Sequence, residues 1–580
     1  MNTSKWVMRH RIMLSPRGEM KVTFPVLLAA FLSASIWAGE VNREAARPDT
    51  QTFDREVKES AEQLRLPGLS LAVVQDGTLL HRVRLGFSDL DSRRPVADGD
   101  LFWLASVTKT FSAVMLMQYE QEGRLSLEDP LIEYPFTSVG FYPQRIDGTV
   151  RLKHVLSHTS EGIPGTAFVY NGARYNFIYG VFQEMSGLKY PQAYTHELDV
   201  RIVRPLGLEA TLAGYPNTNQ NSLRARVVTP YVFDSAKQQF VVNRSAMNPG
   251  TAYPGTGLLS CIKDLAAYGT ALDNDRLLTR SSYGRMTSPF ELNDGRLSAY
   301  GFGWFTTDFA GVRLHWAYGL GDSDSAILVR VPSRKLNFIL LCNSTFATEP
   351  SYLGGGNPVT SPFIVAFLKH FVFEKDPEAI DYSGNQDTIR KSLNARLAKD
   401  RHPIYIAELL SQALTRTFTE STFKTPIRQG EGLAQLLYDF DRELFTRNDP
   451  AIFLLLAHLS GSGLDEASQM AVEAYNAAGH FHPWNVMSIA RRFEAKGDRA
   501  EALRYYRMLV DANGFDEAGE KIQAYQVLAR EYAKQGDFEK AGDYFWRAHI
   551  YTWQQGGDGA NIAQEINRMA KSRKQQIGRR

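Results

Sequence analysis

The 580-residue sequence contains only two cysteines, Cys261 and Cys342, and no surplus of charge of either sign. Two cysteines exclude a disulfide-rich scaffold and a four-cysteine zinc site, although one bridge between them stays open. With 65 Lys plus Arg against 63 Asp plus Glu, the chain lacks the basic surplus of nucleic-acid-binding proteins. Its apolar share of 44% and charged share of 22% exclude a disordered or fibrous chain.

Long apolar runs are also missing, apart from one near the N-terminus. The run from Val22 to Ala38 follows a basic stretch and ends in small residues, a pattern typical of a secretory signal. It is at the short limit for crossing about 30 Å of hydrocarbon and contains Pro25, so a membrane anchor is the weaker alternative. We expect residues 1–38 to be a signal peptide and the exported protein, periplasmic or secreted, to keep no membrane span.

Several catalytic motifs do not occur. The sequence has no G-x-S-x-G, H-E-x-x-H, G-x-x-x-x-G-K-S/T or C-x-x-C, which argues against α/β-hydrolase, zincin, P-loop and thioredoxin chemistry. Asp322 and Asp324 lie in a Gly-Asp-Ser-Asp-Ser segment that we interpret as a solvated turn. We therefore expect neither a metal ion nor an organic cofactor.

Mixed strands and helices are predicted from residue 55 to about residue 375. Two β-rich runs on either side of Asp-Gly predict a hairpin, and residues 106–121 have a helical pattern. Gly, Pro and Asp then separate four further strand-like runs, and an apolar helix closes the unit. The predicted hairpin strands are Leu69–Val74 and Leu79–Leu85, the later strands are Tyr300–Phe305, Val312–Tyr318, Ala326–Val331 and Leu336–Cys342, and the closing helix is Phe363–Phe373.

One short motif suggests a nucleophile. Ser106 and Lys109 are three residues apart at the start of a helical run, so they share one helix face. The strongly apolar residues that follow predict a desolvated Lys109, whose pKa would then approach the value that a proton acceptor needs at neutral pH. A serine hydroxyl can be activated in this way without a histidine. The simple alternative is a Ser helix cap with a surface lysine.

The surroundings of this motif resemble a known family. Residues 101–131 (LFWLASVTKTFSAVMLMQYEQEGRLSLEDPL) closely resemble the active-serine region of serine β-lactamase-related hydrolases, which include class C β-lactamases, D-alanyl-D-alanine carboxypeptidases and related esterases. Three later segments resemble further family landmarks in the right order: residues 151–160 (RLKHVLSHTS), 255–268 (GTGLLSCIKDLAAY) and 340–344 (LLCNS). The resemblance implies an α+β fold in which helices flank an antiparallel sheet, with an all-α subdomain and the serine in the cleft between them.

The family's second element, Y-x-N, is only partly kept. Its register places Tyr170 at the tyrosine position, where the phenol near Lys109 would ionise more easily and relay a proton. The asparagine position holds Gly172, which removes an amide that binds the lysine and the substrate. Asn171 is adjacent, but we expect its side chain to point elsewhere. A packed aromatic residue is the alternative interpretation of Tyr170.

The family's third element, K-T-G or H-x-G, departs further. Counting back from Pro332 puts Ala317 at the cationic position, then Tyr318 and Gly319. Because strand side chains repeat every two residues, His315 faces the same side as Ala317 and is a candidate substitute, with a plain surface histidine equally open. The resemblance implies an oxyanion hole made by the backbone N–H groups of Ser106 and Leu320.

Beyond residue 376 the pattern becomes helical, and two segments match each other. Residues 486–510 and 525–550 share seven positions at equal offsets, 39 residues apart, with Gly-Asp at the centre of each. These segments resemble tetratricopeptide repeats, with an irregular helical bundle as the alternative. We expect a linker over residues 39–54, the hydrolase-like domain over 55–375, a helical connecting region over 376–450, and tetratricopeptide-like repeats over 451–580.

Two functions follow from these features. The first is an exported serine hydrolase that acts on an ester, an amide or a D-amino-acid peptide through a Ser106 acyl-enzyme. Gly172, His315, Ala317, Tyr318 and Gly319 would line its substrate site. The second is a catalytically weak scaffold that uses the helical repeats to bind a protein partner, because the concave surfaces of such repeats commonly bind peptides or proteins.

Overall fold

The computed structural model describes residues 50–135, 148–247, 252–375, 380–425, 428–447, 449–459, 464–478, 483–511, 519–554 and 560–577. The expected signal peptide and most of the expected linker therefore lie outside the described residues. Helix α1 (Thr50–Gln63) begins inside the range expected for the linker. Phe53 and Val57 lie one helical turn apart on α1 and are fully buried, so apolar burial stabilises this helix as part of the folded unit.

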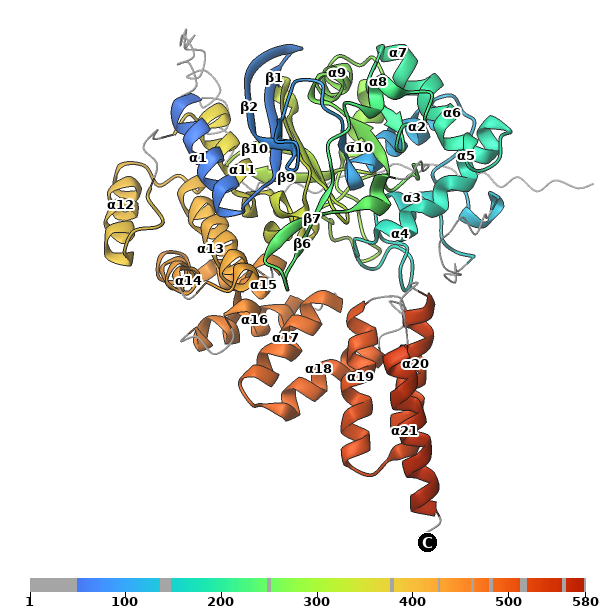
Figure 1. Ribbon diagram of the computed structural model, residues 1–580, viewed down its shortest axis with the longest axis vertical. Helices are drawn as coiled ribbons and strands as arrows, with labels where there is room; N and C mark the ends of the chain where they lie inside the picture. Colours follow the sequence, from blue (N-terminus) through green and yellow to red (C-terminus); the bar gives the residue numbers. More distant parts are fainter. Residues whose placement is uncertain are drawn as a thin grey trace, which may run out of the picture. The chain divides into compact units, whose positions relative to one another are not determined.

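A seven-stranded antiparallel sheet forms the centre of this unit (Figure 1). Its order is β3-β2-β1-β12-β11-β10-β9, with the strands β1 (Gly68–Gln75), β2 (Thr78–Asp89), β3 (Arg94–Pro95), β9 (Phe305–Phe309), β10 (Val312–Leu320), β11 (Ser325–Val331) and β12 (Leu336–Cys342). The predicted hairpin is confirmed as β1–β2. Asp76 and Gly77 join its strands with φ angles of 45° and 78°, the positive values that a tight hairpin turn requires.

One predicted strand is wrong. Residues 300–305 make only an isolated pairing between Tyr300 and Phe305, and the strand β9 begins at Phe305 instead. Gly303 has a φ angle of +78°, a left-handed conformation that ends an extended run and that glycine adopts without steric cost. The two glycines in this segment therefore make a turn before the strand.

Helices cover both faces of the sheet. Successive side chains of a strand point to opposite faces, and both faces carry buried apolar residues. On β11, Ile327 packs in the hydrophobic cluster that contains residues of α1 and α11 (Pro362–Phe367). Its neighbour Leu328 packs on the opposite face with α2 (Thr108–Gln121) and α9 (Ile262–Asp273). The N-terminal helix α1 and the closing helix α11 thus pack on the same face of the sheet, the face that contains Ile327.

A mostly helical subdomain lies between β3 and β9 in the sequence. Every residue of α2 from Thr108 to Met117 is buried, so α2 is a core helix without a polar face. The other helices of this part are α3 (Leu152–Leu156), α4 (Gly172–Tyr175), α5 (Tyr179–Ser186), α6 (Gln192–Leu198), α7 (Arg204–Leu206), α8 (Asn221–Arg224) and α10 (Arg280–Thr287). Its short strands are β4 (Phe102–Trp103), β5 (Leu212–Ala213), β6 (Tyr231–Asp234), β7 (Gln239–Val242) and β8 (Leu258–Ser260). The predicted α+β class and the all-helical C-terminal region are confirmed, whereas the subdomain that was expected to be all-α also contains these short strands.

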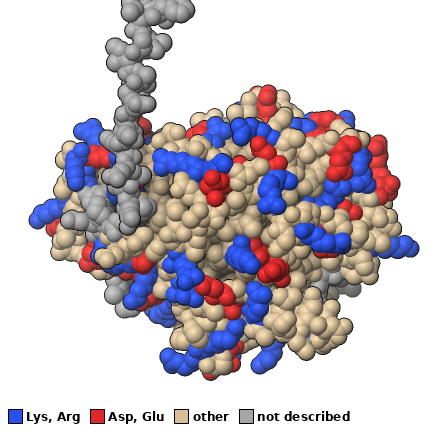
Figure 2. Space-filling view, turned by 90° about the horizontal axis from the view of Figure 1, so that it is seen from above, with Lys and Arg blue, Asp and Glu red and all other residues tan. Residues whose placement is uncertain are grey.

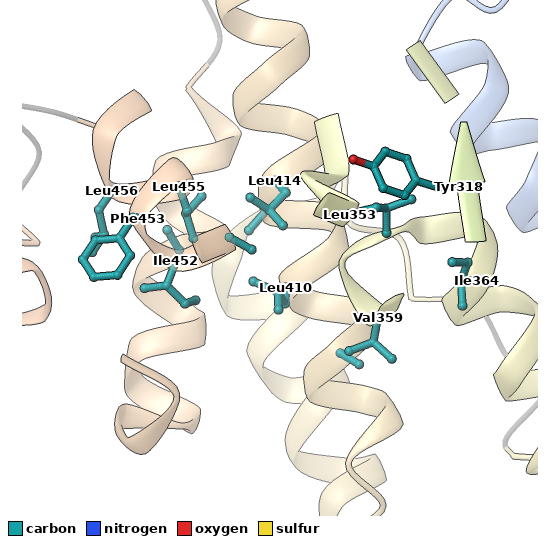
Figure 3. Packing of buried hydrophobic residues seen from close by; sticks show 14 of the residues in the cluster. Tyr318, Leu353, Val359, Ile364, Leu410, Leu414, Ile452, Phe453, Leu455 and Leu456 are labelled. Atoms are coloured by element: carbon teal, nitrogen blue, oxygen red, sulfur yellow. The ribbon is translucent and has the colours of Figure 1, made fainter. Parts of the chain in front are cut away.

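The described C-terminal part is entirely helical. Its helices are α12 (Gln386–Lys399), α13 (Ile404–Phe423), α14 (Gln429–Phe440), α15 (Pro450–His458), α16 (Asp465–Ala478), α17 (Pro483–Ala495), α18 (Arg499–Asp511), α19 (Gly519–Lys534), α20 (Phe538–Gln554) and α21 (Ala560–Ile577). The first of them pack onto the sheet layer rather than forming a separate body. Figure 3 shows Tyr318 of β10, Val359, Leu410 of α13 and Ile452 of α15 in one continuous apolar cluster.

The two self-similar segments form helical pairs with the same turn geometry. Gly497 precedes α18 with a φ angle of +79°, and Gly536 precedes α20 with a φ angle of +80°. The next residues, Asp498 and Asp537, each accept a backbone N–H from three residues further on, as helix N-caps do. The segments are thus structurally equivalent, while their identity as tetratricopeptide repeats stays a prediction.

Two further expectations can be compared with the described part of the chain. None of its helices combines the length and the hydropathy needed to cross a bilayer. Cys261 and Cys342 are both buried free thiols, so the bridge left open above is not formed. Figure 2 shows Lys and Arg side chains interspersed with Asp and Glu on one face, in keeping with the balanced composition.

Candidate active site

The predicted nucleophile and base are in contact. Ser106 lies in the short 3-10 helix η1 (Ala105–Val107), which leads directly into α2, and Lys109 lies in the first turn of α2. The Lys109 ammonium donates to Ser106 Oγ at 2.8 Å and to the backbone carbonyl of Gly255 at 2.9 Å. Ser106 is partly exposed, whereas Lys109 is only 1% exposed. The hydroxyl can therefore meet a substrate while the amine stays out of water.

Burial determines the protonation of Lys109. Desolvation disfavours the ammonium form and lowers the pKa of Lys109 from 10.5 to about 7. A neutral amine can accept the hydroxyl proton of Ser106, so this pKa suits a general base at neutral pH. The groups around the amine include the rings of Tyr170 and Tyr175, whose centroids lie 5.2 Å and 5.5 Å from Lys109 Nζ.

A pH dependence follows from this pKa. We expect acylation of Ser106 to rise with pH through an apparent pKa of about 7, because only the neutral form of Lys109 accepts the proton. Rates of covalent labelling measured between pH 5 and 9 would check this rise. A rate that is flat from pH 5 to 9 would contradict the assignment of Lys109 as base.

The backbone around the nucleophile is tightly constrained. Ala105 has a φ angle of +42°, a left-handed conformation that a residue with a side chain adopts only under local strain. A Cβ atom added to Gly319 on β10 would lie 2.2 Å from the carbonyl oxygen of Leu104. Only glycine therefore lets β10 approach the residue before η1 this closely, and Leu320 is the next and last residue of β10. This arrangement is what an oxyanion hole formed by the Ser106 and Leu320 amides needs.

Tyr170 joins the pair from the segment before α4. Its side chain is hydrogen-bonded to that of Ser106, and Lys109 Nζ lies 5.2 Å from the centroid of its ring. The expectation that Lys109 makes the phenol easier to ionise is wrong: burial raises the pKa of Tyr170 well above 10, against the smaller lowering effect of the Ser106 bond. Tyr170 is thus a neutral O–H group that can pass a proton on, and it packs against Tyr318, with ring centroids 5.5 Å apart.

Gly172 occupies the predicted place next to the base. A Cβ atom at Gly172 would lie 3.5 Å from Lys109 Nζ, an ordinary contact distance, so a side chain there would face the amine. Asn171 points elsewhere, as expected: its amide donates to Glu161 Oε1 at 2.6 Å, and its Oδ1 accepts the backbone N–H of Arg174. A side chain at position 172 would thus face Lys109, but Gly172 has no amide to offer it.

His315 is not brought to the site. It lies near the middle of β10, four residues before Gly319, and is buried, and its Nδ1 is 2.7 Å from the hydroxyl of Tyr283. Burial, helped by the charge of Arg330, lowers the pKa of His315 to about 3, so its ring is neutral at physiological pH. The proposed substitution of His315 for the missing cation is therefore wrong. Ala317 is also buried, and its methyl side chain provides no charge.

Two further residues hold the site together: sequence reasoning missed Gly255, but it predicted His158 as a hydrogen-bonding structural residue of a turn rather than a general base. Gly255 supplies the carbonyl that Lys109 binds, and His158 accepts the backbone N–H of Asn171 through Nδ1 at 3.2 Å, with its ring 4.3 Å from that of Tyr170. Gly255 begins a segment that resembles a family landmark, but the sequence does not show that its backbone carbonyl binds a side chain. The turn aspartate Asp324 also differs from expectation, because it is buried.

The chain is similar to known proteins. Residues 53–353, just over half of the chain, match the family described as Beta-lactamase. The chain is similar to a β-lactamase of Pseudomonas fluorescens (26% identity, covering 38% of this chain and 63% of that protein) and to a penicillin-binding protein of Bacillus subtilis strain 168 (24%, 40% and 58%). It is also similar to a D-aminopeptidase of Gluconobacter oxydans strain 621H (24%, 49% and 57%).

Two solved structures are also similar. They are the octameric penicillin-binding protein homologue from Pyrococcus abyssi (TM-score 0.46, 20% identity, covering 60% of this chain and 81% of that one) and a penicillin-binding protein from Bacillus halodurans (TM-score 0.42, 17%, 50% and 95%). The chain spans about three fifths of the length of the curated relatives named above. The family match, together with the sheet, the helical subdomain and the Ser106–Lys109–Tyr170 cluster, shows that this chain belongs to the β-lactamase family.

Proposed function

We propose that this chain is an exported serine hydrolase that works through a Ser106 acyl-enzyme. The observation that carries the proposal is the contact of 2.8 Å between the Ser106 hydroxyl and the buried amine of Lys109. Ser106 Oγ attacks the substrate carbonyl carbon while Lys109 takes the hydroxyl proton. The backbone amides of Ser106 and Leu320 bind the oxyanion.

The second half of the cycle uses the same groups. As the bond to the leaving group breaks, a proton passes from Lys109 through the Tyr170 hydroxyl to the leaving oxygen or nitrogen. Water then attacks the acyl carbon, Lys109 accepts a proton from that water, and Ser106 is released with its hydroxyl restored. No step requires a group beyond these residues and water.

The two departures from the family pattern favour a particular substrate. Ala317 offers no cation for a substrate carboxylate, and Gly172 offers no amide for an acyl-side amide group. We therefore place an ester, or an amide lacking that carboxylate, before a penicillin as the preferred substrate. A short peptide with an N-terminal D-amino acid also fits, and the similarity to a D-aminopeptidase supports that class.

A covalent probe tests the proposal. Incubation with a fluorophosphonate should add one adduct at Ser106, seen as a mass shift of the intact protein and located by peptide mapping. Ser106→Ala should give no adduct and should lose ester hydrolysis by at least about a thousandfold. Conversion of Ser411, a buried serine of α13, to Ala is the matched control and should keep the adduct. Equal hydrolysis by the parent and the Ser106→Ala variant would overturn the proposal.

The alternative is a scaffold whose catalytic centre is weak. Loss of the amide at Gly172 and of the cation at Ala317 favours it, as do the two equivalent helical pairs in the C-terminal region. Ser106-dependent turnover of any ester counts against this function. Capture of one defined partner that survives Ser106→Ala but requires residues 483–554 would favour it.

A further inference from the structure

Because Gly172 has no side-chain amide, another group must hold the amine of Lys109 in place beside Ser106. One face of the Lys109 amine contacts Ser106, and its other bond goes to the carbonyl of Gly255. Gly255 lies in the loop before β8, 146 positions away from Lys109 in the sequence. Because a loop carbonyl is only as well placed as its loop, something must hold Gly255 in position.

Asn176 provides that restraint. It lies four residues after Gly172, so it lies on the same side of the α4 segment one turn later. Asn176 Oδ1 accepts the backbone N–H of Gly255 at 2.7 Å, and Asn176 itself is 6% exposed. The two polar groups of one residue, Gly255, are therefore bonded to Asn176 on one side and to Lys109 on the other.

The space around Gly255 admits no side chain. A Cβ atom there would lie 2.8 Å from Asn176 Oδ1 and 2.8 Å from the carbonyl oxygen of Gly172. The loop thus packs directly on the two residues that replace the family's single asparagine: Gly172 contributes the backbone and Asn176 the amide. In a buried site such bonds are strong, and their loss leaves a donor without a partner.

We propose that Asn176 is a positioning residue for the general base: through Gly255 it fixes the amine of Lys109 against Ser106, in place of the amide that Gly172 lacks. This inference rests on the proposed serine hydrolase function. It also explains why the space at Gly172 can stay open toward the substrate, because the base no longer depends on a side chain there.

Three variants test the inference by the rate and the pH dependence of fluorophosphonate labelling. Asn176→Ala should slow labelling about tenfold to a hundredfold, because Gly255 loses its partner. The acid limb, meaning the low-pH part of the profile in which the labelling rate rises with pH, should move to higher pH in this variant. The reason is that water entering beside Gly255 relieves the burial of Lys109. Asn176→Asp keeps the acceptor oxygen, so labelling at high pH should recover, while the new negative charge moves the acid limb higher still.

The control is Asn337→Ala, which removes another fully buried asparagine whose amide binds Asp273. Its labelling rate and acid limb should equal those of the parent, whatever happens to its melting temperature. Parent-like rates and limbs in both Asn176 variants would overturn the inference while leaving the proposed function intact. Absence of Ser106 labelling in the parent would overturn the proposed function itself. If Asn176→Ala fails to fold, the acid limb of Asn176→Asp alone decides.

Discussion

Replacing Lys109 by Met is expected to abolish acylation of Ser106 and at the same time to stabilise the protein. Without the amine no group takes the hydroxyl proton, and we expect labelling to fall at least about a thousandfold. The stabilisation follows from burial: the pKa of Lys109 falls to about 7 in the folded protein, so folding takes an ammonium out of water. Methionine fills a similar volume without that cost.

The stability difference between Lys109→Met and the parent should depend on pH. Below about pH 7 the buried amine destabilises the parent fully, and the penalty disappears as pH rises toward 10.5, where the unfolded chain also loses the proton. Denaturant unfolding at pH 7 should therefore show Lys109→Met about 2–4 kcal/mol more stable than the parent, less at pH 10. The hydrogen bonds to Ser106 and Gly255 reduce the gain. A variant that is less stable than the parent at pH 7 would show that desolvation does not dominate.

The nucleophile and base could be predicted because their chemistry is local. Ser106 and Lys109 are three residues apart in one continuous helical run, and the apolar residues that follow predict the burial of the amine. Tyr170 could be placed by register. Its protonation could not, because the surrounding rings that desolvate it, such as Tyr318, come from distant segments.

The failures concern what packs against a residue. Strand periodicity placed His315 on the same side as Ala317, but it does not predict which residues of other elements pack against the His315 ring. Burial and the charge of Arg330 on β11 lower the pKa of His315, and the hydroxyl of Tyr283 on α10 contacts its Nδ1. Gly255 and Asn176 were missed for a similar reason, since their contribution is a backbone bond formed between segments that only the fold brings together.

The limits of the hydrolase-like domain were also hard to place from the sequence. A change in composition near residue 376 suggested a boundary, yet a buried charge network crosses it. Lys369 of η11 (Leu368–Val372) is fully buried and pairs with Glu56 of α1 at 2.5 Å and with Glu408 of α13 at 3.2 Å. His370 binds Glu56 as well, and Arg396 of α12 binds Glu408. Single-sequence patterns cannot show four helices that share charges across some 350 positions.

Removing the central cation should therefore destabilise the whole described unit. Burial alone would lower the pKa of Lys369, but Glu408 and Glu56 raise it, so the ammonium is charged in the folded protein. Lys369→Met leaves the two carboxylates buried with only His370 and Arg396 as partners. We expect a loss of about 3–5 kcal/mol at pH 7, measured by denaturant unfolding. The melting of the hydrolase-like domain and of the adjoining helices should shift together.

The matched control is Lys335→Met, because Lys335 is half-exposed and pairs with Asp76 at the surface at 3.3 Å. That change should cost less than about 1 kcal/mol. Acid narrows the difference: as pH falls, the unpaired carboxylates of the Lys369→Met variant become protonated and their penalty disappears. Equal losses in the two variants, or a Lys369→Met loss that does not shrink toward pH 4, would mean that packing rather than charge joins the helices to the sheet layer. A loss confined to the melting of α12–α14 would show instead that these helices fold apart from the sheet, and the boundary near residue 376 would then be a true domain limit.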